Sequence, residues 1–173
     1  MKLTVIIGSL RKESLNKQLS NIIIEKLAND IEVQYLEYAN IPYMNEDIEF
    51  PTPQSILEIR NIIKASDILW VFTPEYNGQI PGVLKNLFDW LSRPEIKGDW
   101  KTGSVIKNKP VMISSVAGKS KGLGARESLV TLLTRLQMQV LSNEGISFKA
   151  GQLDLTLEEL EIIDKQIQHL KSD

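Results

Sequence analysis

The chain has 173 residues, of which 42% are hydrophobic and 24% are charged, and its 20 basic and 22 acidic side chains give a net charge of −2. These proportions are typical of one globular domain, which we expect to span residues 1–173, and they exclude disordered, collagen-like and coiled-coil chains. A general nucleic-acid binder would carry a large basic excess, which this chain lacks. Because the chain has no cysteine and a single histidine, His169, we expect no metal site and no cysteine or histidine-triad catalysis.

The N-terminal segment is predicted to be a strand and not a targeting signal. Its apolar run, Leu3 to Ile7, is too short for a secretory signal, and charged residues 11–13 follow it closely. The longest apolar runs, such as Ile68 to Phe72, have about five residues, whereas a membrane helix needs about 20. We therefore expect a cytoplasmic protein without a membrane segment, and the absence of cysteine agrees with a reducing compartment.

Strands and helices alternate through the first half of the chain. Apolar runs predict buried strands, and apolar residues at helical spacing predict amphipathic helices. Thr52 is expected to cap the second helix, with Pro53 at the first helical position. The predicted elements are a strand over 3–7, a helix over 15–27, a strand over 32–38, a helix from Pro53 to Ile63, and a strand over 67–73.

The same alternation continues through the second half. A capping box formed by Thr156 and Glu159 predicts the start of the last helix. The predicted elements are a helix from Pro81 to Leu91, a strand over 109–116, a helix face over 129–136, a fifth strand region divided between 140–142 and 146–148, and a last helix that reaches Leu170.

Five strands alternating with five helices predict an open, parallel α/β sheet with helices on both faces and right-handed crossovers. In such a sheet, ligands bind at the carboxyl ends of the strands, which directs attention to the loops after the first, third and fourth strands. The segment from Arg93 to Asn108 is the only long irregular stretch. We expect it either to cover the site or to form a subunit contact.

The loop after the first strand, Gly8 to Asn16, has the composition of an anion site. It leads into a helix N-terminus, where free N–H groups and the helix dipole attract negative charge. Its neutral side chains are joined by the two-pronged cation of Arg11, and together these donors suit a terminal phosphate. A helix capped by Ser14 beside a solvated Arg11–Lys12 pair is the alternative interpretation. The loop matches neither G-x-x-x-x-G-K-[ST] nor G-x-G-x-x-G, which argues against a nucleotide hydrolase and a pyrophosphate-binding dinucleotide domain.

The loops after the third and fourth strands also have unusual compositions. Residues 73–82 contain two prolines and two glycines, which fix a backbone that a ligand can approach closely. Such a loop would present N–H groups to the edge of a flat heteroaromatic ring, and Tyr76 would stack on that ring or line a substrate cavity. The third loop, Ser114 to Gly124, is rich in small residues. Each loop alone is compatible with a plain connection, but three such loops at one sheet edge favour a ligand site.

These motifs resemble the NADPH-dependent FMN reductase family over roughly the first 135 residues. The similarity implies a flavodoxin-like three-layer sandwich with strand order 2-1-3-4-5, FMN as the cofactor, and NADPH or NADH as the electron donor. One departure lies in Gly118 to Gly124, which read G-K-S-K-G-L-G where relatives often have adjacent glycines. The resemblance is carried by Gly8-Ser9-Leu10-Arg11 with Ser14 and Asn16, by Ile41 to Asp47, by Pro74-Glu75-Tyr76-Asn77-Gly78, by Pro81 to Asn86, by Asp89-Trp90 and by Ser92-Arg93-Pro94.

The resemblance also assigns cofactor-binding residues. The FMN phosphate would be held by Ser9, Arg11, Ser14, Leu15 and Asn16. The isoalloxazine ring would be bordered by Pro74, Glu75, Tyr76, Asn77 and Gly78. The other side of the flavin would be lined by Ser114, Ser115, Val116, Ala117, Gly118 and Lys119. No catalytic side chain is expected, because the cofactor carries the chemistry, and Tyr76 is the expected substrate contact.

The implied function is an NAD(P)H oxidoreductase that passes electrons through FMN to a quinone, azo compound, flavin or similar acceptor. The donor and the acceptor would use one site in turn, which gives ping-pong kinetics, and the resemblance implies a homodimer or homotetramer. The choice between NADH and NADPH stays open, because the basic residues near the third loop would suit a 2′-phosphate or simply be surface charges. The basic residues in question are Lys119, Lys121 and Arg126.

Two alternatives share the fold and the cofactor: a flavodoxin-like one-electron carrier and a non-catalytic flavin-binding protein. Flavodoxins have a Thr/Ser-rich phosphate loop without arginine and a strongly acidic surface, whereas this loop contains Arg11 and the net charge is −2. Three further residues are expected outside the chemistry. Glu75 is expected as a hydrogen-bond partner, Trp90 as a core or interface residue, and His169 as a surface residue near a helix end.

Overall fold

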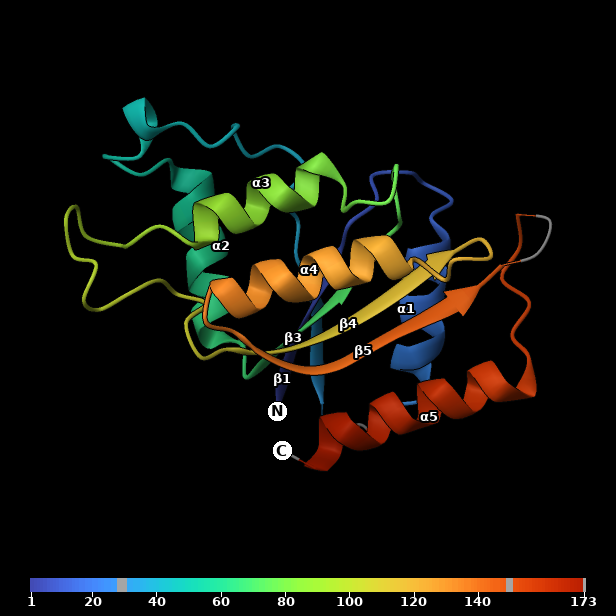
Figure 1. Cartoon of the computed structure of the whole chain (residues 1–173). Helices are drawn as coiled ribbons and strands as arrows, with labels where there is room; N and C mark the ends of the chain where they lie inside the picture. Colours follow the sequence, from blue (N-terminus) through green and yellow to red (C-terminus); the bar gives the residue numbers. More distant parts are fainter. Residues whose placement is uncertain (28–30, 149–150, 173) are drawn as a thin grey trace.

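A computed structural model describes residues 1–27, 31–148 and 151–172 as a layered α/β arrangement (Figure 1). Helices alternate with strands along the chain, as the hydrophobic patterns predict. The elements are β1 (Lys2–Ile7), α1 (Leu15–Glu25), β2 (Glu32–Tyr35), the 3-10 helix η1 (Glu46–Ile48), α2 (Gln54–Ala65), β3 (Ile68–Phe72), α3 (Gly82–Leu91), β4 (Pro110–Ala117), α4 (Leu123–Arg135), β5 (Gln139–Ser147) and α5 (Leu157–Ser172).

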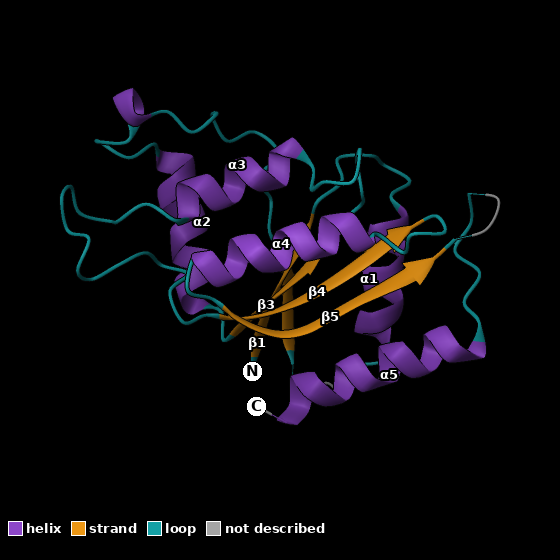
Figure 2. Ribbon diagram, in the orientation of Figure 1, coloured by secondary structure: helices purple, strands orange, loops and turns teal. Residues whose placement is uncertain are grey.

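The strands form one parallel sheet in the order β2-β1-β3-β4-β5, which confirms the predicted topology. β1 lies between β2 and β3, and Val5 pairs with Tyr35 on one side and with Trp70 on the other. The connection after β1 leads to β2 on one side, and the connection after β3 leads to β4 on the other, so a topological switch point lies between β1 and β3. Figure 2 shows the strand arrowheads ending together at one edge of the sheet, where such a fold binds its ligands.

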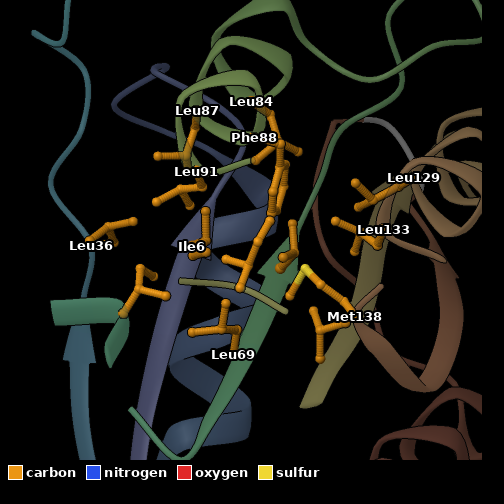
Figure 3. Close-up of a cluster of buried hydrophobic side chains, with 14 of the residues drawn as sticks. Ile6, Leu36, Leu69, Leu84, Leu87, Phe88, Leu91, Leu129, Leu133 and Met138 are labelled. Carbon is orange, nitrogen blue, oxygen red and sulfur yellow. The ribbon is translucent and has the colours of Figure 1, made fainter. Parts of the chain in front are cut away.

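The two faces of the sheet are covered by different helices. On one face, apolar residues of α2, α3 and α4 pack against Ile6, Leu69 and Val71 (Figure 3). On the other face, residues of α1 and α5 pack against Val5, Trp70 and other strand residues. Because both faces of β3 are covered, all of its residues from Ile68 to Phe72 are buried, which explains its continuous apolar run.

Several predicted boundaries differ from the structure. β2 ends at Tyr35 and not at Tyr38, although Leu36 and Tyr38 remain buried in the core just after it. β5 is one continuous strand that pairs with β4 on both sides of a register shift at Leu141, where two short segments were expected. The predicted cap at Thr52 was wrong. The N-cap of α2 is Pro53, which makes no side-chain cap bond, and the Thr52 hydroxyl donates to the Glu49 carbonyl at 2.9 Å.

Other predictions about individual residues are confirmed. Thr156 and Glu159 form the capping box: the Glu159 N–H donates to the Thr156 hydroxyl at 3.2 Å, and the Thr156 N–H donates to the Glu159 carboxylate at 3.1 Å. Trp90 is fully buried, and its indole N–H donates to the Pro42 carbonyl at 2.8 Å. His169 is exposed in the last turn of α5.

The irregular segment 93–108 lies at the end of the sheet away from the strand arrowheads (Figure 1). It is attached to the 3-10 region by Arg93, whose guanidinium donates to both Glu49 carboxylate oxygens at 2.9 and 2.8 Å and lies 5.0 Å from the centre of the Trp100 ring. The expectation that this segment covers the ligand edge was therefore wrong, and a subunit contact there stays a prediction. Among the described residues, no helix is both long and apolar enough to cross a membrane.

Candidate functional site

A cleft of about 320 Å³ opens at the carboxyl ends of β1, β3 and β4, where the three predicted loops meet. The position agrees with the switch point of the sheet. Nine of the residues that line it belong to these loops or to the first turn of α1, Val116 and Ala117 end β4, and two more follow β5. The lining residues are Ser9, Arg11, Ser14, Leu15, Asn16, Pro74, Glu75, Tyr76, Val116, Ala117, Gly118, Phe148 and Gly151.

The N-terminus of α1 leaves hydrogen-bond donors available to the cleft. Ser14 caps the helix by accepting from the Lys17 N–H at 3.4 Å, whereas the N–H groups of Leu15 and Asn16 have no partner in the described part of the chain. The exposed guanidinium of Arg11 also makes no hydrogen bond or ion pair with a described residue. Unpaired N–H groups at a helix N-terminus beside a free arginine are suited to a phosphate group, so these residues fit the terminal phosphate of FMN.

The side chain of Asn16 links the first loop to the fourth strand. Asn16 is 3% exposed, its amide nitrogen donates to the Val116 carbonyl at 3.2 Å, and its amide oxygen accepts from the Val116 N–H at 2.9 Å. Both the nitrogen and the oxygen of the side-chain amide are therefore hydrogen-bonded to the backbone of Val116. Asn16 can offer its own backbone N–H to an anion, while its side chain fixes the distance between two walls of the cleft.

The second loop folds as a two-residue hairpin. The N–H and C=O groups of Tyr76 and Gln79 exchange hydrogen bonds of 3.0 Å, and both central residues have positive φ, 53° for Asn77 and 74° for Gly78. This is a type I′ turn, for which Asn-Gly is the preferred sequence. The turn leaves the N–H groups of Asn77 and Gly78 without partners among the described residues, and it holds Tyr76 on the cleft with 52% of its surface exposed.

The carboxylate of Glu75 joins the second loop to the third. Gly122 is the N-cap of α4 and has no side chain to cap it, and Glu75 supplies this function by accepting from the Ala125 N–H at 3.0 Å. Its other oxygen accepts from the Ser120 hydroxyl at 2.9 Å. The Ala125 N–H, followed by the Ser120 hydroxyl, holds the pKa of Glu75 below its ordinary value. Glu75 is therefore a hydrogen-bond partner, as expected, and not a free proton donor.

Close backbone packing reinforces this junction. A Cβ atom on Gly124 would lie 2.7 Å from the Gly78 carbonyl oxygen and 3.1 Å from the Glu75 carboxylate, so only glycine fits at this position. Gly122 has a φ of 69°, and a Cβ atom there would collide with Ser115. The spaced glycines of the third loop thus allow α4 to begin directly against the hairpin.

The predicted third loop overlaps the end of β4, which extends to Ala117, and its first residues are divided between the cleft and the interior. Val116, Ala117 and Gly118 line the cleft, and Gly118 has open space where a side chain would be. Ser114 and Ser115 are buried and do not line it. The Ser114 hydroxyl accepts from the Trp70 indole at 2.9 Å and donates to the Gln166 side chain at 3.0 Å, while the Ser115 hydroxyl donates to the Thr73 carbonyl at 2.6 Å. Hydroxyls engaged in this way are not available to a ligand.

Three of the predicted cofactor-binding residues also lie outside the cleft lining, and two lining residues were not predicted. Asn77 and Gly78 form the hairpin tip, and Lys119 is exposed beyond Gly118. Phe148 and Gly151 come from the segment after β5. The signal for them was available, because the carboxyl end of every parallel strand reaches the same edge, and Phe148 directly follows the fifth strand.

Of the basic residues near the third loop, Arg126 is already engaged. Its guanidinium donates to the Lys121 carbonyl at 3.1 Å and to the Asn143 carbonyl at 3.0 Å, and burial lowers its pKa. This geometry gives Arg126 a structural role between α4 and β5. A 2′-phosphate contact from this region would therefore have to come from the exposed Lys119 or the half-buried Lys121.

The comparisons with known proteins agree with this site. The family model for NADPH-dependent FMN reductases matches residues 1–152. The chain is 31% identical over 148 residues to a 2-hydroxy-1,4-benzoquinone reductase of a Burkholderia species, covering 84% of this chain and 81% of the relative. It is 37% identical over 134 residues to a quinone reductase of Pseudomonas putida, covering 74% of this chain and 69% of the relative.

A solved structure shares nearly the whole fold. FerB, a flavoenzyme NAD(P)H:acceptor oxidoreductase from Paracoccus denitrificans, superposes with a TM-score of 0.84 at 26% identity, covering 96% of this chain and 93% of FerB. The strand order, the three loops at the switch point and the match over residues 1–152 lead to one conclusion: the chain belongs to the NADPH-dependent FMN reductase family.

Proposed function

We propose that this protein is an FMN-dependent NAD(P)H oxidoreductase that reduces a quinone or a similar small-molecule acceptor. The observation that carries the proposal is a group of hydrogen-bond donors at the switch point that have no partners among the described residues. They are the Leu15 and Asn16 N–H groups and the Arg11 guanidinium, and they lie on a cleft whose other walls are already hydrogen-bonded to one another. These donors suit one terminal phosphate in a preformed site.

The three loops would divide the work of binding FMN within a single domain over residues 1–173. The β1–α1 loop would hold the phosphate through Ser9, Arg11, Ser14, Leu15 and the backbone of Asn16. The hairpin would offer the free N–H groups of its tip to the edge of the isoalloxazine ring, with Pro74, Glu75 and Tyr76 beside it. Val116, Ala117 and Gly118 would border the other side, with any contribution from Ser114, Ser115 and Lys119 made by the backbone.

Bound FMN supplies the redox chemistry, since it accepts hydride from NAD(P)H and passes electrons to the acceptor. The protein has to bind and orient the flavin and the substrate and shield them from water, and the residues around the cleft suit these roles. Both carboxylate oxygens of Glu75 accept hydrogen bonds, from the Ala125 N–H and the Ser120 hydroxyl, so Glu75 holds the hairpin against α4. The N–H groups at the hairpin tip would stabilise negative charge that develops on the adjacent ring. Tyr76, half exposed on the cleft, would contact the substrate.

Quinones are the acceptor class that the relatives favour, because both curated relatives described above are quinone reductases. A planar quinone suits a cleft bordered by Tyr76 and Phe148, where aromatic contact would orient it. Azo compounds and free flavins are planar acceptors of the same kind. We further propose a cytoplasmic homodimer or homotetramer, in which a second subunit would complete the wall around the open side of the cleft.

The test is a visible spectrum of FMN-loaded, desalted protein, recorded anaerobically before and after NADPH, NADH and then a benzoquinone. We expect retained flavin absorbance that the nicotinamide bleaches and the quinone restores. Steady-state rates should give parallel lines in a double-reciprocal plot, because donor and acceptor use one place in turn. Flavin absorbance that neither NADPH nor NADH bleaches would refute the proposal in favour of an electron carrier or a flavin-binding protein without catalysis. Intersecting lines would refute the shared site.

A further inference from the structure

A second cavity adjoins the flavin cleft on the other side of the β1–α1 loop. It has a volume of about 300 Å³ and lies at the carboxyl ends of β1 and β2. We define it as the basic pocket. Its lining residues are Ile7, Ser9, Leu10, Arg11, Lys12, Lys17, Tyr35, Leu36, Glu37, Tyr38 and Ala39. Ser9 and Arg11 also line the flavin cleft, so a single loop separates the two cavities.

The pocket carries positive charge on a chain whose net charge is −2. Its wall contains Arg11, Lys12 and Lys17 against one carboxylate, that of Glu37. None of these four side chains forms an ion pair with a described residue. Three unpaired cations beside a single carboxylate attract an anionic group, and Arg11 is placed to serve both cavities.

The pocket also offers apolar and aromatic surface. Tyr35 is partly exposed, and the Lys17 ammonium lies 5.8 Å from the centre of its ring. Tyr38 is 4% exposed, and its hydroxyl donates to the Ile7 carbonyl at 2.7 Å, so its ring forms the floor of the pocket. Leu10 is 62% exposed on the dividing loop. Rings and a leucine beside a cluster of cations suit a nucleoside attached to a phosphate, and the volume lies at the low end of ligand cavities, which range from about 300 to 1,000 Å³.

We propose that the basic pocket binds the nucleoside 5′-phosphate half of a dinucleotide. The inference rests on the proposed function, because the partner half would occupy the flavin cleft. Two dinucleotides carry this chemistry. In FAD, the riboflavin phosphate would lie at the N-terminus of α1, and the second phosphate and the adenosine would continue across Ser9 and Arg11 into the pocket. In NAD(P)H, the adenosine end would reach the pocket while the nicotinamide lies in the flavin cleft.

The test compares ligands on a variant that removes two pocket cations without touching the flavin cleft. Lys12→Ala/Lys17→Ala changes two exposed residues that do not line the cleft, and alanine at position 17 maintains helix α1. A matched control, Lys165→Ala/Lys171→Ala, removes two exposed cations on α5, far from both cavities. Dissociation constants are measured by fluorescence titration of the apoprotein with FMN and with FAD, and of the FMN-loaded protein with oxidised NADP⁺.

We expect the pocket variant to weaken FAD or NADP⁺ binding by about tenfold, as two charge-assisted contacts to phosphate would, and to change FMN binding by less than about twofold. Selective loss of FAD affinity identifies the flavin dinucleotide as the ligand, and selective loss of NADP⁺ affinity identifies the pyridine dinucleotide. Equal losses for FMN and FAD with NADP⁺ unaffected, or equal losses in the control variant, would overturn the proposal, as would no loss at all. Failure of NADPH to bleach the wild-type flavin would refute only the proposed reaction, since these binding constants do not depend on turnover.

Discussion

Replacing Asn16 with alanine tests whether the walls of the cleft are fixed by one side chain. Asn16→Ala removes both hydrogen bonds to Val116, a residue that is itself 3% exposed, and leaves the buried N–H and C=O groups of Val116 without these partners. An ordinary hydrogen bond contributes about 1 kcal/mol net, and a buried polar group left unpaired costs about 1–3 kcal/mol. We therefore expect the free energy of unfolding to fall by about 2–4 kcal/mol.

The expected fall in Tm follows from the chain length. For a domain of this size, 1 kcal/mol shifts Tm by about 2–4 °C, so the variant should melt about 5–15 °C lower than the wild type. Differential scanning calorimetry of the apoprotein measures this shift. The matched control is Asn21→Ala on the same helix, where the exposed amide accepts one hydrogen bond from the Tyr35 hydroxyl at 2.6 Å. Its effect should stay within about 0.5 kcal/mol, as for most surface substitutions.

A second variant at this position separates the hydrogen bonds from side-chain volume. Asn16→Asp keeps the shape and the acceptor for the Val116 N–H, but when ionised it places a carboxylate oxygen against the Val116 carbonyl. Its stability deficit should narrow as the pH is lowered, because a protonated carboxyl can donate to that carbonyl. A Tm for Asn16→Ala equal to that of Asn21→Ala, or a deficit of Asn16→Asp that does not depend on pH, would refute the reasoning.

Four further substitutions examine the loops one at a time. Arg11→Ala should weaken FMN binding about tenfold in a fluorescence titration and leave the apoprotein Tm unchanged, because Arg11 has no partner among the described residues; unchanged affinity would remove Arg11 from the phosphate site. Tyr76→Ala should lower turnover more than stability, since Tyr76 is 52% exposed; normal turnover with a lower Tm would assign it a structural role. Glu75 has a lowered pKa in the folded state, so its contribution to stability is present above its unfolded pKa and is lost as the pH falls through the folded pKa; Glu75→Gln should flatten that part of the Tm-versus-pH curve, and an unaltered curve would contradict the helix-cap assignment. Gly124→Ala should destabilise the protein by about 1–3 kcal/mol through the clash with the hairpin, and a Tm equal to the wild type would show that the hairpin moves aside without cost.

The fold was predictable because its patterns are local and repeat. The apolar run of β3 indicates that both faces of the strand are buried. Apolar residues at helical spacing, such as Leu84, Leu87 and Leu91, indicate a helix that packs one face against the core. What failed was the detail that depends on neighbours. Thr52 has the sequence signature of a cap, but the N-cap of α2 is Pro53, so Thr52 lies one position before the cap and its hydroxyl donates to the Glu49 carbonyl. A displacement of a helix start by one residue depends on the surrounding fold and is not visible in a linear pattern.

The site was predictable to the level of loops but not of side chains. Strand order alone brings the first, third and fourth loops to one edge, so the place of the cleft follows from topology. Within those loops, a polar residue can face the ligand or the interior. Ser114 faces the interior, where its hydroxyl accepts from the buried Trp70 indole. The same hydroxyl donates to the side chain of Gln166, 52 residues further along the chain. A partner that distant is outside any loop motif.

Hydrogen bonds between the loops explain how a cleft built largely from loops can hold a ligand in one orientation. Asn16 links the first loop to β4, and Glu75 links the hairpin to α4. Gly124 allows the backbone of α4 to pack directly against the hairpin. Each of these contacts forms within the protein, so the entropy of ordering the loops is lost during folding and not during binding. Within the described parts of the chain, the Leu15 and Asn16 N–H groups, the N–H groups at the hairpin tip and the Arg11 guanidinium have no hydrogen-bond partners. Because a ligand would satisfy these donors without rearranging the loops, its binding energy would appear as affinity and as fixed geometry for hydride transfer.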